Sequence, residues 1–232
     1  MTLNLPTPSN FRGLDENRPV RFYERHMPHW RQDGATYFVT FSLADAMPAN
    51  KQLEIESLKR EWEHRHPPPR TERDWLDYAK SVYDLSEKAL DAGFGRCWFR
   101  NSCYIDELKR SLFHFHQKRY ELGCYVIMAN HCRLVMRPFD DIELEDELGA
   151  IKRTTSRFVN QHEGLTGPLW TQESYDRIIR DDEHLYRVVQ YIGSNPAKAG
   201  LPEVHWQCWF NPEWETIGWK FDDGCSRSVE CQ

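Results

Sequence analysis

The sequence lacks the features that would place the chain in a membrane or in a repetitive fibre. It has no run of about eighteen apolar residues, the shortest that reads as a membrane-spanning helix. The N-terminus has no basic segment followed by an apolar one, so we expect a soluble, cytoplasmic protein with no membrane partner. No internal repeat or low-complexity tract occurs, which favours an ordinary globular domain.

The seven cysteines also lack any arrangement typical of a zinc site or a disulfide framework. Their number is odd, and no two of them form a Cys-x-x-Cys pair. We therefore expect reduced thiols, as in a cytoplasmic protein. The positions are Cys97, Cys103, Cys124, Cys132, Cys208, Cys225 and Cys231.

Net positive charge is missing as well. The chain has 30 Lys and Arg against 36 Asp and Glu, a formal charge of −6, which argues against a general nucleic-acid binder. A local basic group follows an acidic segment at 140–147 and consists of Lys152, Arg153 and Arg157. Acidic residues near the start of a helix and basic residues near its end suit the helix dipole whatever the function. The three basic residues therefore fit either a solvated basic face or a set of DNA phosphate contacts.

What is present is a composition suited to one packed domain: 232 residues, 40% hydrophobic and 13% aromatic, with nine tryptophans. Hydrophobic periodicity predicts strands at 35–43 and 174–179, a β-hairpin over 125–138, and helices at 51–64, 75–90, 104–121, 143–162 and 181–195. Pro196 is expected to stop the last helix. We divide the chain into a polar N-terminal arm (1–28), a domain (29–210) with a lengthened helical connection (45–92), and a C-terminal arm (211–232) with a loose end.

The stretch 125–138 organises the rest of the chain. Two apolar, β-rich runs meet at residues 128–130, and His131 begins the second run. Side chains alternate faces along a strand, so His131, Arg133 and Val135 share one face. The other face carries Cys132, Leu134 and Met136. An imidazole and a guanidinium side by side on a strand indicate a functional site.

The predicted helix at 181–195 offers a second half for this site. Leu185, Val188, Val189 and Ile192 form its apolar stripe. Tyr191 lies about 110° from the centre of that stripe, at its edge, and Asn195 follows one turn later. A phenol at the edge of the stripe can reach the strand that carries His131.

Both segments resemble the REP-associated tyrosine transposases, which belong to the HUH single-tyrosine transposases. "YVIMANHCRLVM" is similar to that family's "YVVMPNHVHLL", with Arg133 in place of the second histidine. Residues 29–48 look like the family's first strand. "LWTQESYDRIIRDDEHLYRVVQYIGSNPAKAGL" (169–201) resembles its tyrosine segment, and the likeness covers roughly residues 20–210.

The resemblance implies a ferredoxin-like α+β fold: an antiparallel sheet of four or five strands with helices packed mainly on one face. It implies cleavage and rejoining of single-stranded, REP-like hairpin DNA by Tyr191 through a 5′-phosphotyrosine, with Tyr175 and Tyr186 as competing tyrosines. It also implies a divalent metal, Mg²⁺ or Mn²⁺, weakly held by His131 and Asn195. A monomer is expected rather than a homodimer.

Arg133 leaves three interpretations open. A guanidinium has no usable lone pair, so it cannot bind a cation. It could contact the scissile phosphate in an active enzyme. It could instead mark a non-catalytic hairpin-DNA-binding protein whose metal site is lost, or be an isolated or engineered substitution.

Two histidine pairs imitate the metal motif, His114 with His116 and His64 with His66. The first pair falls on a predicted helix, where residues two apart diverge by about 200°, and the second runs into three prolines. We expect both to be solvated or locally capped.

The C-terminal tryptophans 206, 209, 214 and 219 could pack as a cap, or stack on DNA bases.

Overall fold

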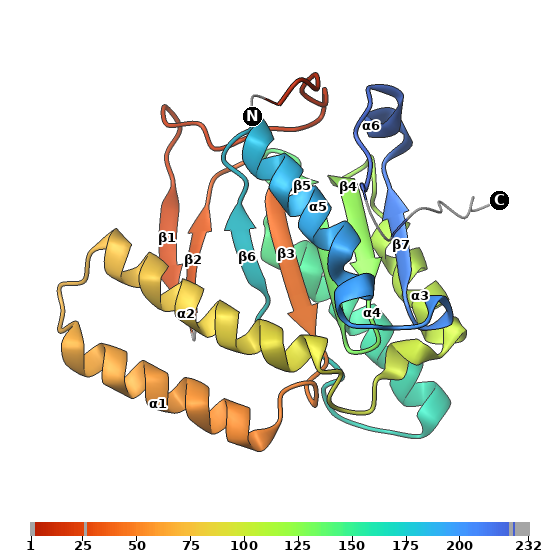
Figure 1. Ribbon diagram of the computed structural model, residues 1–232, viewed down its shortest axis with the longest axis horizontal. Helices are drawn as coiled ribbons and strands as arrows, with labels where there is room; N and C mark the ends of the chain where they lie inside the picture. The colour runs from red at the N-terminus through yellow and green to blue at the C-terminus, as the bar shows by residue number, and fades with distance from the viewer. Residues whose placement is uncertain (1–2, 26, 223–224, 226–232) are drawn as a thin grey trace.

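The computed structural model describes residues 3–25, 27–222 and 225, and its centre is a five-stranded antiparallel sheet (Figure 1). The strand order is β6-β3-β5-β4-β7. The strands are β3 (Tyr37–Ser42), β4 (Tyr120–Ile127), β5 (His131–Pro138), β6 (Tyr175–Ile178) and β7 (Gln207–Phe210). The predicted α+β fold with a sheet of four or five antiparallel strands is confirmed, and the four strands other than β7 have the ferredoxin-like order.

Helices cover both faces of this sheet. The two crossover helices, α3 (Ser102–Phe113) and α4 (Leu144–Glu163), share one face, and α5 (Asp182–Lys198) lies across the other (Figure 1). The alternation along β5 decides which side chain meets which helix. Leu134 packs in the core under α3 and α4, whereas Val135 packs under α5. The strand thus turns His131 and Arg133 toward α5, as the sequence predicts.

A helical hairpin precedes α3. It consists of α1 (Ala49–Arg65) and α2 (Glu72–Asp91), held together by aromatic rings such as Trp62 and Trp75, whose centroids lie 4.7 Å apart. Thr71 and Asp74 form a capping box that starts α2. The C-terminal half of α2 approaches that of α5 at one end of the sheet (Figure 1). This placement brings α2 to the candidate site.

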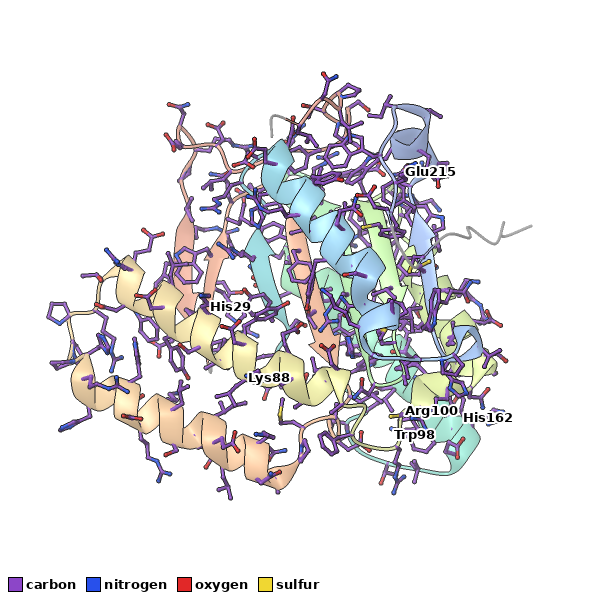
Figure 2. All side chains as sticks on the ribbon, viewed as in Figure 1. His29, Lys88, Trp98, Arg100, His162 and Glu215 are labelled. Carbon is purple, nitrogen blue, oxygen red and sulfur yellow. The ribbon has the colours of Figure 1, made fainter. Side chains whose placement is uncertain are left out.

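A small two-stranded sheet, β1 (Arg21–Glu24) with β2 (Pro28–Arg31), is fastened to the main sheet by a buried charge network. Asp176 of β6 accepts two hydrogen bonds of this network through its Oδ1 atom. Arg31 Nη2 lies 3.0 Å from Asp176 Oδ1, and His29 Nδ1 lies 2.8 Å from the same oxygen. Glu145 of α4 is a second partner of Arg31 at 2.6 Å. Figure 2 shows His29 on β2 beside α2. Burial raises the pKa of Asp176, but the hydrogen bonds from His29 and Arg31 outweigh it and hold this pKa below its usual value.

One predicted helix is too long. The range 104–121 was expected to be helical throughout, but α3 ends at Phe113, a turn follows, and β4 begins at Tyr120. The turn requires a positive φ of 62° at Gln117. His114 and His116 therefore lie at the end of the helix and in the turn, and His116 Nδ1 accepts from the backbone N–H of Leu122 at 3.2 Å. Apolar spacing continued past the helix because the following strand is also apolar.

His66, of the second histidine pair, caps its own helix. Its Nδ1 lies 3.0 Å from the Trp62 carbonyl oxygen, and its ring stacks on the Trp62 indole.

The prediction that Pro196 stops the last helix is wrong, because α5 continues to Lys198 with Pro196 inside its final turn. Pro196 has no N–H to donate within the helix, and α5 ends two residues after it.

Two C-terminal tryptophans pack as a cap. The side chains of Trp214 and Trp219 are buried in the core beside α5. The Trp214 ring lies so close to β4 that a Cβ at position 123 would approach it to 2.3 Å, so only glycine fits there. The predicted loose end of the C-terminal arm lies mostly outside the described residues. No helix in the described ranges is long and apolar enough to cross a membrane.

Candidate functional site

The structure brings together four residues that the sequence assigned to one site. His131 and Arg133 come from β5, and Tyr191 and Asn195 come from α5. The Arg133 guanidinium carbon lies 5.1 Å from the centre of the Tyr191 ring, and the Asn195 amide lies close enough to His131 to favour its protonated ring. His131, Arg133 and Asn195 are buried, and Tyr191 is half-buried.

Hydrogen bonds fix the tautomer of His131. The Asn130 side-chain nitrogen donates to the carbonyl oxygens of Leu90 and Phe94, at 3.3 and 3.1 Å. Its oxygen must then face His131 Nδ1, 2.8 Å away, so Nδ1 carries the proton and Nε2 keeps its lone pair. Burial, and then the charge of Arg133, lower the pKa of His131 well below its ordinary value. The ring is therefore neutral at physiological pH.

Arg133 is held by α2. Its Nη2 donates to Glu87 Oε2 at 2.6 Å and lies 3.6 Å from Asp91 Oδ1. The Arg133 side chain is fully buried, and that of Glu87 is 14% exposed. Burial raises the pKa of Glu87, and the Arg133 charge opposes that rise. Glu87 carries no signal in the sequence as a site residue, because 46 residues separate it from Arg133 and only the tertiary fold brings them together.

Tyr191 also meets α2. The Tyr83 hydroxyl donates to the Tyr191 hydroxyl at 2.9 Å. Of the competing tyrosines, Tyr186 donates to Asp222 on the C-terminal arm, and Tyr175 packs its ring against Tyr83 with centroids 4.2 Å apart. Tyr191 is thus the tyrosine of these three whose ring lies against Arg133.

Three observations bear on whether a divalent metal fits this site. His131 Nε2 and Asn195 Oδ1 are buried acceptors without a hydrogen-bond donor, which suits a cation. The same positive charge of Arg133 that disfavours a proton on His131 disfavours a divalent cation more strongly. Among the described residues, no group of three or more His, Cys, Asp or Glu side chains could hold a metal ion. The donor set does not fit, and the metal implied by the resemblance stays a prediction.

The predicted basic residues of α4 do not join the site. Arg153 and Arg157 are exposed on a helix that covers the opposite face of the sheet from α5. The Lys152 ammonium donates to the carbonyl oxygens of Thr171 and Gln172, at 3.1 and 3.4 Å. Burial lowers the pKa of Lys152 to about 8. Their contact with DNA stays a prediction.

A basic cluster that the sequence analysis missed lies on the α5 face. Burial, then the charges of Arg177, Arg180 and Arg187, lower the pKa of His184 to about 4. All three arginines are exposed, and Arg177 lies opposite Phe38, whose side chain packs in the core beside α5. We call these three arginines the α5 cluster. The signal was present in "YDRIIRDDEHLYR", where acidic neighbours cancel the local charge.

The α5 cluster continues toward Tyr191. Arg187 lies four residues before Tyr191 on the same helix, so both project from one side of α5. On the far side of the tyrosine, the Lys198 ammonium lies 5.2 Å from the centre of its ring. Positive side chains thus precede and follow the tyrosine.

Comparisons with known proteins give a limited result. No family model matches the chain, and no curated protein matches it. Among solved structures, it is similar to the structure of a REP-associated tyrosine transposase bound to a REP hairpin. The likeness covers 90% of this chain and 98% of the other, with 13% sequence identity and a TM-score of 0.37.

Proposed function

We propose that this chain binds single-stranded DNA that folds into a hairpin, along the face that carries α5. The observation that carries the proposal is the α5 cluster of exposed arginines, in which Arg187 lies one turn before Tyr191 on α5. Exposed guanidinium groups bind phosphates whatever the base sequence. The preference for a hairpin comes from the resemblance of the two motif segments. An overall charge of −6 limits such binding to a local surface.

Strand cleavage by Tyr191 is the second candidate function. The Tyr191 oxygen would attack a phosphorus atom and lose its proton to solvent, and the bond from phosphorus to the leaving 3′ oxygen would break. The leaving oxygen would take a proton from solvent, so that a 5′-phosphotyrosine and a free 3′-OH result. Arg133, whose guanidinium lies against the Tyr191 ring, would stabilise negative charge on the phosphoryl oxygens. No step requires the metal, for which the donor set does not fit.

The groups needed for cleavage have other partners in the free protein. Tyr83 engages the Tyr191 hydroxyl, and Glu87 engages Arg133. A phenol is also a weak nucleophile at neutral pH unless a base or a cation activates it. The neutral His131 ring has an unpaired Nε2 that could serve as a base for the phenol, but the His131 side chain is fully buried.

One experiment tests both functions. A labelled pool of hairpins with randomised single-stranded flanks is titrated with the protein, and a blunt duplex of the same length is the control. We expect the hairpins to bind at least about tenfold more tightly than the duplex. Equal affinity for the two DNAs, or no binding at low salt, would contradict the proposal.

The same mixtures, run on a denaturing gel, test cleavage. A covalent adduct in the unmodified protein that disappears in Tyr191→Phe would establish the second candidate function. The variant lacks only a hydroxyl, so we expect its hairpin affinity to stay within about 1 kcal/mol of the original. Tyr175→Phe is the matched control. If the adduct disappears in Tyr175→Phe and persists in Tyr191→Phe, the assignment of Tyr191 as the nucleophile is wrong.

A further inference from the structure

Helix α2 places two side chains on the candidate site. Glu87 pairs with Arg133 at 2.6 Å, and one turn earlier Tyr83 bonds to the Tyr191 hydroxyl at 2.9 Å. The two contacts come from one face of α2, because residues four apart in a helix are neighbours. This helix therefore engages both groups that a DNA phosphate would meet.

The hydrogen-bonding capacity of Arg133 is only partly used. A guanidinium carries five N–H donors. Arg133 Nη2 meets Glu87, but Nε and Nη1 are buried without a partner. Buried donors of a charged group normally all find acceptors. A further acceptor beside Nε and Nη1 would satisfy Arg133 more completely.

Carboxylate and phosphate present similar oxygens to a guanidinium, and arginine binds both through the same planar fork. Glu87 lies nearer to solvent than Arg133, with a side chain 14% exposed against 0%. Displacing its carboxylate would free the Nη2 donor of Arg133. The Arg133 guanidinium itself lies over the ring of Tyr191.

We propose that Arg133 is a binding site for a phosphate group of the DNA, and that Glu87 occupies this site in the free protein until the phosphate displaces it. This inference rests on the proposed function, since it locates one DNA phosphate within the same site. It also explains why a carboxylate lies in a region that would bind an anion.

The first test uses inorganic phosphate as the probe, with ionic strength held constant by chloride. The melting temperature of Glu87→Gln should rise with phosphate concentration, and that of the unmodified protein should rise much less. In Glu87→Gln/Arg133→Met the rise should disappear, because the guanidinium is gone. No rise in Glu87→Gln, or an equal rise in the double variant, would overturn the proposal.

Glu87→Gln leaves Asp91 Oδ1, 3.6 Å from Nη2, as a more distant counter-charge for the buried Arg133 and could fail to fold. Glu87→Asp keeps the charge but withdraws the carboxylate by one methylene, so it should fold and show a smaller rise of the same kind. Asp84→Asn removes an exposed charge one turn away on the same helix, and its response should match that of the unmodified protein.

The second test measures hairpin affinity. If Glu87 leaves Arg133 free in about a tenth of the molecules or fewer, Glu87→Gln should bind the hairpin at least about tenfold more tightly. A purely structural role for Glu87 predicts unchanged or weaker binding. A phosphate response without any hairpin binding would leave the anion site standing and remove the proposed function. Hairpin binding without a phosphate response would keep the proposed function and remove the anion site at Arg133.

Discussion

Replacing Arg133 with histidine is expected to convert a site that binds Mn²⁺ very weakly into one that binds it at least about a thousandfold more tightly. Two unit charges 4 Å apart repel by about 4 kcal/mol at an effective dielectric of 20, and a divalent ion would feel more. The substitution removes that repulsion and adds an imidazole on the strand face of His131. It also frees the Glu87 carboxylate, which attracts cations.

Titration calorimetry with Mn²⁺ measures this change. Arg133→Met is the matched control, since it removes the charge without adding a ligand, and it should gain much less affinity than Arg133→His. Adding His131→Ala to Arg133→His should abolish the gain. If Arg133→His binds Mn²⁺ no better than the unmodified protein, the charge of Arg133 is not what prevents metal binding.

Asp176→Ala should lower the free energy of unfolding by about 3–5 kcal/mol, because it removes the shared partner of two buried groups. Arg31 and His29 both bond to this carboxylate, and the Asp176 side chain is 2% exposed. Arg31 keeps Glu145, which limits the loss. The network joins β2 to the main sheet and α2 packs beside β2, so the position of α2 over the site should also suffer.

Urea unfolding followed by fluorescence measures this loss. Asp33→Ala is the control: Asp33 bonds to Arg21 at 2.9 Å, but their side chains are 52% and 54% exposed, so its loss should cost less than about 1 kcal/mol. Equal effects from the two substitutions would mean that the buried network contributes little to stability.

Local patterns in the sequence were sufficient for the central hairpin and the helix that packs on it. Alternation along 131–136 assigned each side chain of β5 to the correct face, and the apolar stripe of α5 placed Tyr191 at its edge. Both signals depend on residues within one or two turns of each other. The edge position of Tyr191 indicated that it could reach the strand of His131, and the structure places Tyr191 against Arg133 and Asn195 near His131 on that strand.

The rest depends on contacts between distant segments. Nothing local marks Glu87 or Tyr83 as partners of the site, since α2 is 46 residues from Arg133 and 108 residues from Tyr191 at these contacts. The α5 cluster was hidden because Arg177 lies on a strand and Arg187 on a helix, and only the fold places both near His184. Charge counting along the sequence does not detect such a surface.

The salt dependence of hairpin affinity tests most directly the claim that DNA lies on the α5 face. Affinity is measured at several salt concentrations for the unmodified protein, for Arg177→Gln/Arg180→Gln/Arg187→Gln, and for Arg153→Gln/Arg157→Gln on α4. Each lost phosphate contact should reduce the slope of log affinity against log salt by about 0.7 on single-stranded DNA. We predict that the α5 variant loses about 2 from its slope and at least about tenfold in affinity, more than the α4 variant loses. An unchanged slope in the α5 variant, with the loss confined to the α4 variant, would contradict the claim.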